Sequence, residues 1–441
     1  MTSETSEIKD AVFSLLRSGG LERTSKTPAS LDEIRKDALQ TLSNLDFPTN
    51  KHEEWKYTDI TKALKKNFDF NRYSTAPAYT REQLDPFKYP GMDANYLVFI
   101  NGKFSGELSD YSSLGQSILI ENLTVAFDQN HSLIREHFAK HAEFQKDFFN
   151  ALSTAFTEDG VFIRIFDGAI IERPIVFLMI SDSTNGNTVA QPRNLICVGK
   201  NCKAILIENY ISVGDNPQFT NAVSELVLDE NSFVDYYKLQ NEKENTYHVG
   251  TTQVYQSRNS NFSSTTVTTN GGVIRNNLNI KLDGEGAEAT MYGLYLLNGK
   301  THVDNHTAVD HAQPKALSNE LYKGVMNGKS TGVFNGKIYV RKDAQKTNAF
   351  QSNRNVLLSD DASINTKPQL EIWADDVKCS HGATTGQIDE EALFYLQSRG
   401  ISKDKAKALL MTAFASEIIK VIKVKEVKES LEKLIDELLH K

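Results

Sequence analysis

The chain has 441 residues, of which 24% are charged, and its formal net charge is -8. This acidity argues against nucleic acid or an anionic membrane surface as the main partner. No apolar run approaches the roughly 18 residues that cross a bilayer, and the start, MTSETSEIKD, lacks the basic segment and apolar core of a signal peptide. We therefore expect a cytoplasmic protein. The length is typical of about three domains, although a single elongated domain would also fit. The cysteines, Cys197, Cys202 and Cys379, are too few for a disulfide framework.

The amino-terminal region is expected to be helical. Apolar residues at helical spacing predict a first helix over residues 8–16. Ser30 and Glu33 form a capping-box pattern, which predicts that a second, amphipathic helix begins there. Trp55 and Tyr57 follow, and we interpret both as aromatic anchors that hold the helices to the rest of the chain.

The next segment combines a hairpin with further helix. Two apolar runs, residues 97–100 and 103–104, flank an Asn-Gly pair, the preferred turn of a two-residue β-hairpin. Helical spacing returns over residues 131–156, where His137 and His141 are four residues apart and would share a helix face. Two such histidines can hold zinc, but the glutamate base and third ligand of a metalloprotease helix are missing. We therefore expect a solvated polar face.

Residues 161–372 have a different character. Short β-rich runs such as VFIRIF, IVFLMI, KAILIE and FSSTTVT alternate with Gly, Asn, Asp and Ser turns, without an amphipathic helix between them. This pattern excludes an alternating α/β architecture and leaves a sandwich, a barrel or a solenoid. A phosphate-loop lookalike over residues 324–330 and a dinucleotide-fingerprint lookalike over residues 284–289 are not followed by helix patterns, so we interpret both as turns.

Three histidines, His302, His306 and His311, lie close together within this β-rich region. In an extended chain His302 and His306 share a face while His311 points the other way, so a three-ligand site would need a turn between them. Imidazole is a common metal ligand and also a common hydrogen-bonding group of protein cores. The pattern leaves both interpretations open.

Residues 367–386, KPQLEIWADDVKCSHGATTG, contain the pair with the most distinctive chemistry, Cys379 and His381. If the segment is extended, side chains two residues apart share a face, so the thiol and the imidazole would point into one small volume. These two donors suit iron in a cluster or zinc. The alternative is a buried cysteine beside a hydrogen-bonded histidine.

The chain is expected to be helical after residue 386. Asp389 is positioned to cap a short helix that Gly400 would end, and Ser402 to cap a second one. A last apolar stripe at helical spacing covers residues 424–438.

Residues 367–386 resemble the signature of the SufB/SufD family, whose members belong to the SUF system of iron-sulfur cluster assembly, and within it the SufD subunits. The stretch FPTNKHEEWKYTD, residues 47–59, resembles the family's amino-terminal signature. Residues 302–325 and 336–362 also resemble family segments. The resemblance covers most of the chain and is weakest over residues 73–150.

The resemblance implies a mainly β fold with three parts. A right-handed parallel β-helix would occupy residues 156–386, between a mostly helical amino-terminal domain, residues 1–155, and a helical carboxy-terminal domain, residues 387–441. The solenoid would leave open strand edges at its ends, and a partner chain is a natural cover for them.

The resemblance also implies a function. The chain would be a non-catalytic scaffold subunit that pairs through its β-helix with a SufB-like subunit and through its terminal helices with a SufC-like ATPase. A nascent iron-sulfur cluster would form at the interface, with His381 and then Cys379 as candidate ligands shared with the partner. ATP would bind to the ATPase and not to this chain, and reduced FAD is a further ligand expected of the complex, with no residue of this chain assigned to it. In isolation the chain could form a homodimer.

Two other classes remain open from the residues alone. A self-pairing β-helix could bind ligands without an ATPase partner. A parallel β-helix can also be a carbohydrate-active enzyme, which would require acidic residues clustered on one face of the solenoid.

Overall fold

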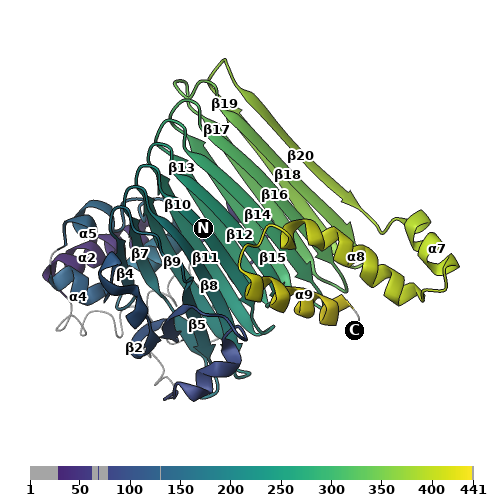
Figure 1. Cartoon of the computed structure of the whole chain (residues 1–441), viewed down its shortest axis with the longest axis horizontal. Coiled ribbons are helices and arrows are strands. Elements are labelled where there is room, and N and C mark those ends of the chain that lie inside the picture. The colour runs from purple at the N-terminus through teal and green to yellow at the C-terminus, as the bar shows by residue number, and fades with distance from the viewer. Residues whose placement is uncertain (1–27, 62–67, 69–77, 130, 440–441) are drawn as a thin grey trace.

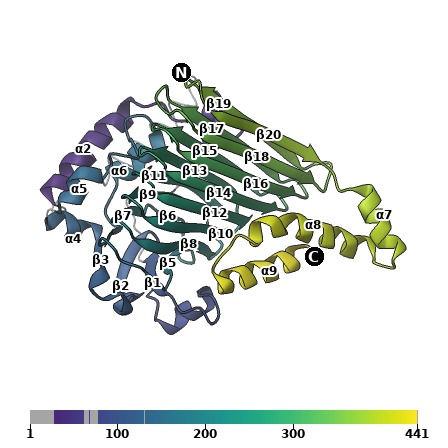
Figure 2. The ribbon, with the colours of Figure 1, turned by 45° about the horizontal axis from the view of Figure 1, so that its top comes forward.

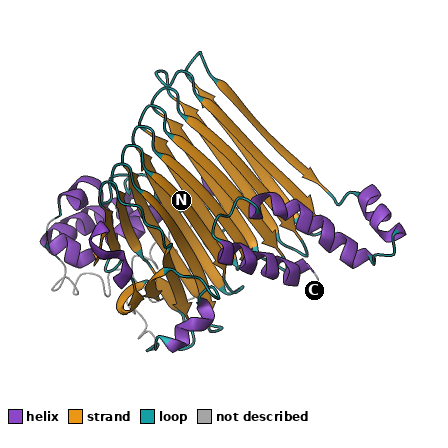
Figure 3. Ribbon diagram, viewed as in Figure 1, coloured by secondary structure: helices purple, strands orange, loops and turns teal. Residues whose placement is uncertain are grey.

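The computed structural model describes residues 28–61, 68, 78–129 and 131–439. The helix expected over residues 8–16 lies outside these ranges. The described chain forms a parallel β-solenoid of about 8 turns with helices on its flanks (Figures 1 and 3). The expectation of a β-helix core is therefore confirmed, and the sandwich and the barrel are excluded.

The solenoid consists of two sheets, named here sheet A and sheet B, and the chain alternates between them as it winds. Sheet A contains β2 (Lys103–Asp110), β1 (Asn95–Ile100), β5 (Ile175–Asp182), β8 (Lys203–Val213), β10 (Phe233–Asn241), β12 (Asn261–Asn270), β14 (Glu288–Leu297), β16 (Leu317–Met326), β18 (Asn348–Leu357) and β20 (Lys378–Gly386), in spatial order. Sheet B contains, in the same direction, β3 (Ile118–Asn122), β4 (Val161–Ile165), β7 (Arg193–Val198), β9 (Gln218–Leu228), β11 (Thr246–Gln256), β13 (Val273–Leu282), β15 (His302–His311), β17 (Thr331–Val340) and β19 (Ser363–Ile372), and β6 (Thr188–Ala190) also pairs with β9. Pairing is parallel except for β1 with β2 and β3 with β4.

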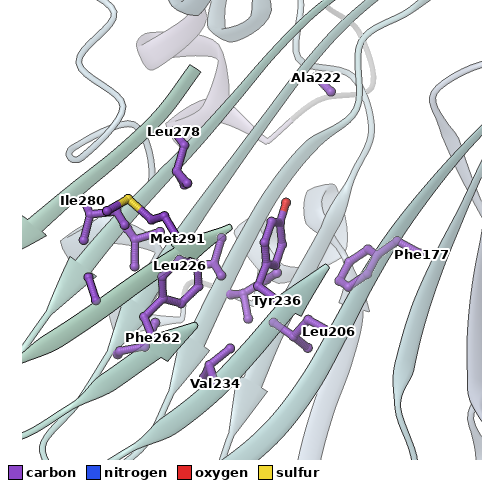
Figure 4. Close-up of a cluster of buried hydrophobic side chains, with 14 of the residues drawn as sticks. Phe177, Leu206, Ala222, Leu226, Val234, Tyr236, Phe262, Leu278, Ile280 and Met291 are labelled. Atoms are coloured by element: carbon purple, nitrogen blue, oxygen red, sulfur yellow. The ribbon is translucent and has the colours of Figure 1, made fainter. Parts of the chain in front are cut away.

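Every second residue of a strand points into the solenoid, because side chains alternate along extended backbone. The apolar members of these inner rows form one continuous core, which includes Phe177, Leu206, Tyr236 and Phe262 (Figure 4). Gly293 lies in an inner row beside Tyr322, and a Cβ at this position would be 2.0 Å from the tyrosine ring. The absence of a side chain at residue 293 thus makes room for the large ring.

An asparagine ladder shapes one corner of the solenoid. Asn201, Asn231 and Asn259 lie on consecutive turns with φ of 56°, 56° and 54°. The left-handed conformation costs asparagine less than most residues. The side-chain amide of Asn231 donates to Asn201 at 3.2 Å, and that of Asn259 donates to Asn231 at 3.3 Å. The asparagine side chain of each turn is therefore hydrogen-bonded to the asparagine of the preceding turn.

Helices of the amino-terminal region cover the outer face of sheet B. They are α2 (Ala29–Asn44), α4 (Leu123–Asp128), α5 (Ser132–His137) and α6 (Phe148–Ala155), with the short 3-10 helix η2 (Glu53–Trp55). Two further 3-10 helices do not lie on this face: η3 (Glu82–Phe87) packs on β1 and β5 of sheet A, and η4 (Ser112–Ser117) connects β2 with β3. The capping box expected at Ser30 and Glu33 is wrong, because α2 begins at Ala29 with Pro28 as its N-cap and no side-chain cap. The proline carbonyl accepts from Leu31 and Asp32, so the first turn begins ahead of Ser30 and encloses it.

The expected hairpin is confirmed as β1 and β2. Its turn residues, Asn101 and Gly102, have φ of 52° and 80°, as a two-residue turn between twisted strands requires. The helix expected over residues 131–156 is interrupted, since α5 ends at His137 and α6 begins at Phe148.

The carboxy-terminal helices are α7 (Glu390–Ser398), α8 (Lys403–Ile419) and α9 (Lys425–Leu439). Asp389 caps α7 by accepting from the N–H groups of Glu391 and Ala392, as expected. Ser402 stands at the N-cap position of α8, but its side chain makes no capping bond. Helices α8 and α9 pack on the outer face of sheet A, whereas α7 projects beyond the sheet (Figure 2). No helix among the described residues has the length and apolarity needed to span a membrane.

Candidate functional site at the open end of the solenoid

The two ends of the solenoid are different. At the amino-terminal end, antiparallel strands close the sheets, β2 beside β1 in sheet A and β3 beside β4 in sheet B. At the other end the sheets finish with β20 and β19, and nothing in the described chain pairs with their outer edges (Figures 1 and 2). The last turn therefore presents free backbone groups, a property that makes an edge strand ready to pair with another chain.

Cys379 and His381 lie on β20, the final strand of sheet A. In the register of the parallel pair, Cys379 is beside Ala349 and His381 is beside Gln351. Ala349 and Gln351 are buried inside the solenoid. Cys379 and His381 therefore belong to the inner rows of the sheet, at the point where those rows reach the open end.

The two side chains have unequal surroundings. Cys379 is half-buried and packs against a small apolar cluster that includes Ile338 and Val340. This burial raises the pKa of the Cys379 thiol, so the free thiol is neutral near pH 7. His381 is exposed. Both donors are thus close to the open surface, where a ligand can reach them.

Two donors do not complete a metal site. Within the described ranges, no group of three or more His, Cys, Asp and Glu side chains is arranged to hold a metal ion. Tetrahedral iron and zinc sites take four ligands. A metal bound by Cys379 and His381 would therefore need further ligands from sulfide or from another chain.

The backbone of β20 points half of its hydrogen-bonding groups away from the solenoid. The Lys378 N–H donates to the Thr347 carbonyl on the preceding turn. Because alternate residues of a strand turn their polar groups to opposite sides, the N–H groups of Cys379, His381, Ala383 and Thr385 face the open edge. The same residues that carry the donor side chains thus offer the free edge.

The neighbouring edge, β19, is less suited to pairing. The N–H groups of Ser363 and Trp373 donate to the preceding turn, so the residues of even number between them face the open edge. One of these is Pro368, which has no N–H to donate. Proline at an outer edge is a common block against pairing. Of the two terminal strands, β20 is therefore the better template. The proline was a signal available in the sequence that our sequence analysis did not use.

His302 and His306 lie on the outer face of β15 and hold the amino-terminal signature segment. His302 Nε2 is 3.0 Å from Thr58 Oγ1, and His306 Nε2 is 2.9 Å from Asp304 Oδ1. Thr58 donates to Asp304 at 2.5 Å. The hydrogen bond from His306, with the nearby Lys337, lowers the pKa of Glu54 to about 2. The two histidines thus form polar contacts that hold residues 54–58 against β15.

His311 points into the solenoid, opposite to His302 and His306, as the alternation predicts. Its Nε2 atom is 2.9 Å from Ser318 Oγ. Burial lowers the pKa of His311 to about 4, so its imidazole is neutral at pH 7. The three histidines do not converge on one point.

Trp55 and Tyr57, the two expected anchors, differ in position. The Arg275 guanidinium lies 3.9 Å from the centre of the buried Trp55 ring and donates to the Glu54 carbonyl at 2.5 Å. Tyr57 is exposed. The anchor interpretation is therefore confirmed for Trp55 and wrong for Tyr57, because only the tryptophan turns toward sheet B.

His137 and His141 are in contact although they do not share a helix. Nδ1 of His137 is 3.1 Å from Nε2 of His141, and burial lowers the pKa of both. The expected solvated face is wrong, because the turn after α5 folds His141 back against Tyr255, with ring centres 4.9 Å apart. Cys197 lines a cavity together with His137 and His141, whereas Cys202 points into the solenoid core.

The described carboxy-terminal helices leave aromatic side chains in solvent. Phe394 and Tyr395 of α7 are 72% and 58% exposed, and Leu409 of α8 is also exposed. Large apolar side chains grouped on a projecting helix commonly mark an interaction surface.

Two family models match the chain and together cover most of it. The first, described as SUF system FeS cluster assembly, SufBD core domain, matches residues 179–414. The second, the SufBD protein N-terminal region, matches residues 15–177.

Individual relatives agree with the models. The chain is 32% identical to an iron-sulfur cluster assembly SufBD family protein of Synechocystis sp., over 87% of this chain and 86% of the relative. It is 30% identical to the iron-sulfur cluster assembly protein SufD of Escherichia coli, over 89% of each chain. It is also 27% identical to the chloroplastic protein ABCI7 of Arabidopsis thaliana, over 92% of this chain and 86% of the relative. The chain belongs to the SufBD family of the SUF system and is a component of iron-sulfur cluster assembly.

Proposed function

We propose that this protein is a non-catalytic scaffold subunit on which a nascent iron-sulfur cluster forms, in a complex with a SufB-like subunit and a SufC-like ATPase. The observation that carries the proposal is the open end of the solenoid, where the free edge of β20 and the side chains of Cys379 and His381 coincide. The cluster is the cargo of this site.

In this proposal the SufB-like subunit pairs with β20. A strand added to that edge would continue sheet A into the partner and extend the inner rows that contain Cys379 and His381. Partner side chains at the end of the extended rows would then lie beside the two donors. This arrangement would supply the additional ligands that are missing around Cys379 and His381 among the described residues of this chain.

The ATPase is proposed to bind at the carboxy-terminal helices. Helices α8 and α9 are anchored on sheet A, since Lys323 pairs with Glu417 at 2.5 Å and Lys423 pairs with Asp235 at 2.7 Å. Helix α7 projects from this base with Phe394 and Tyr395 exposed. A rigid base and an exposed aromatic patch suit a subunit that transmits movement from ATP turnover to the solenoid.

Replacing His381 with alanine should abolish cluster assembly while the complex stays intact, because an imidazole ligand is lost from an exposed position. The measurement is anaerobic cluster reconstitution, followed by visible absorption, on the complex co-expressed and purified with both partners. Ser380→Ala is the matched control, since Ser380 is the neighbour of His381 on β20 but points to the opposite face. Normal assembly in the His381→Ala complex would refute the proposed ligand role.

Replacing Ala383 with proline should prevent association with the SufB-like subunit. The Ala383 N–H faces the open edge, so proline removes a donor needed by the partner while leaving the ladder to β18 in place. The measurement is co-purification of the tagged chain with its partner, with Ala383→Val as the control. If Ala383→Pro binds the partner as well as Ala383→Val does, pairing through β20 is wrong. If the wild-type chain forms only homodimers through this edge, the self-pairing alternative replaces the proposal.

A further inference from the structure

One inner row of sheet A connects His381 with a carboxyl group deep in the solenoid. Glu320 on β16 is beside Gln351 on β18, and Gln351 is beside His381 on β20. Neighbouring strands lie about 4.8 Å apart. The three side chains therefore occupy consecutive positions of one row, which begins in the core and ends at the candidate assembly site.

The two buried members of this row, Glu320 and Gln351, are hydrogen-bonded to each other. Glu320 is 1% exposed and Gln351 is 3% exposed. The Gln351 amide donates to Glu320 Oε2 at 2.8 Å. Gly336 lies across from the amide, and a Cβ there would be 2.0 Å from Gln351 Nε2. The glycine thus leaves the space in which the glutamine side chain is held.

Each of these two side chains has an oxygen atom that accepts no hydrogen bond from the described residues. Oε1 of Gln351 and Oε1 of Glu320 have no hydrogen-bond partner among the described residues. A buried acceptor without a partner costs about 1–3 kcal/mol. Because Glu320 holds the nitrogen side of the amide, the glutamine carbonyl is directed elsewhere, and the next member of its row is His381 with its imidazole N–H.

We propose that Gln351 and Glu320 are positioning residues for His381. When a partner chain covers the open end, Gln351 Oε1 accepts the N–H of one ring nitrogen of His381, and Glu320 holds the amide in the required orientation. The lone pair of the other ring nitrogen then points toward the metal. Histidine ligands of metals usually donate their second N–H to such a partner, which sets the tautomer and strengthens the ligand. This inference rests on the proposed ligand role of His381.

The test measures metal binding without cluster assembly. The complex of this chain with its SufB-like partner is titrated anaerobically with Co²⁺, which reports ligation through visible absorption and stands in for iron. Gln351→Leu should weaken Co²⁺ binding by about 10- to 100-fold, the usual effect of losing a ligand's hydrogen-bond partner. Asn355→Leu is the matched control, because Asn355 is a buried amide on the same face of β18 that lies beside Thr385 instead of His381.

Two substitutions of Glu320 separate positioning from packing. Glu320→Gln keeps an acceptor for the Gln351 amide and should leave the Co²⁺ affinity close to that of the wild type. Glu320→Leu releases the amide and should weaken binding by about 10-fold. Equal affinities in these two variants, or in Gln351→Leu and the wild type, would overturn the inference. If His381→Ala itself leaves Co²⁺ binding unchanged, the proposed function of the site fails and the inference fails with it.

Discussion

Replacing Glu225 with alanine should lower the free energy of unfolding by about 3–5 kcal/mol, the cost of leaving one member of a buried ion pair without its partner. Glu225 on β9 and Arg193 on β7 are both fully buried, and Arg193 Nη2 is 2.7 Å from Glu225 Oε2. Two other guanidinium nitrogens, Nε and Nη1, have no acceptor in the described chain. Without the carboxylate, the buried cation would keep only its contact with the Phe138 ring, whose centre is 5.1 Å from the guanidinium carbon.

Glu225 also holds the amino-terminal region against sheet B. Its carboxylate accepts the N–H groups of Ala139, His141 and Ala142 at 2.8, 2.9 and 2.8 Å. Ala139 has φ of 57°, a conformation that alanine adopts only when its surroundings enforce it. Loss of the carboxylate should therefore also loosen the turn after α5.

Urea unfolding and hydrogen exchange of residues 138–147 measure these two effects. Glu230→Ala is the control, because the pair between Glu230 and Lys200 is at the surface, at 3.4 Å. This control should change the free energy of unfolding by less than about 1 kcal/mol. If Glu225→Ala is no less stable than Glu230→Ala, the buried pair does not anchor the two regions.

Replacing Glu320 with glutamine should stabilise the protein at pH 8 relative to the wild type. Burial raises the pKa of Glu320 from its usual value to about 7, although Gln351 and Thr307 face the carboxyl and partly offset this rise. Tyr322 is a further titratable group that interacts with this carboxyl.

The direction of the pH dependence follows from proton binding. The native state holds the proton up to about pH 7, whereas the unfolded chain releases it near pH 4.5. The contribution of Glu320 to the free energy of unfolding is therefore fully present below about pH 4.5 and is lost as the pH rises through about 7. At about 1.4 kcal/mol for each pKa unit, the ionised carboxyl costs roughly 3 kcal/mol at pH 8.

Urea unfolding of the wild type and Glu320→Gln at pH 5 and pH 8 tests this expectation. The difference in unfolding free energy should move in favour of the variant between the two pH values by about 3 kcal/mol. The same substitution at Glu288, which is exposed on β14, is the matched control. A constant difference for Glu320→Gln would show that the carboxyl titrates as an exposed group does.

The amino-acid sequence by itself determined the type of most elements. Alternating β-rich runs predicted the strands from Val161 onward, the Asn101 and Gly102 pair predicted the hairpin, and Asp389 and Gly400 predicted the limits of α7. These features depend on local backbone preferences and side-chain alternation, which neighbouring residues decide. The resemblance of residues 367–386 to a known family then selected a solenoid from the possible β architectures. The same local pattern placed Cys379 and His381 on one face of one strand.

The tertiary structure decided which residues become neighbours across the strands of a sheet. Register across parallel turns joins residues about thirty positions apart, so neither the row from Glu320 to His381 nor the ion pair of Arg193 and Glu225 is visible in a local pattern. The return of His141 onto His137 depends on a turn held by Glu225, which lies on another strand. Which terminal strand is the better template depends on the side to which each backbone nitrogen points, because the nitrogen of Pro368 faces the open edge of β19 and has no hydrogen to donate. Such long-range contacts arise only when the chain has wound into rungs, and for that reason the open edge of β20 and its inner row became apparent only in the folded molecule.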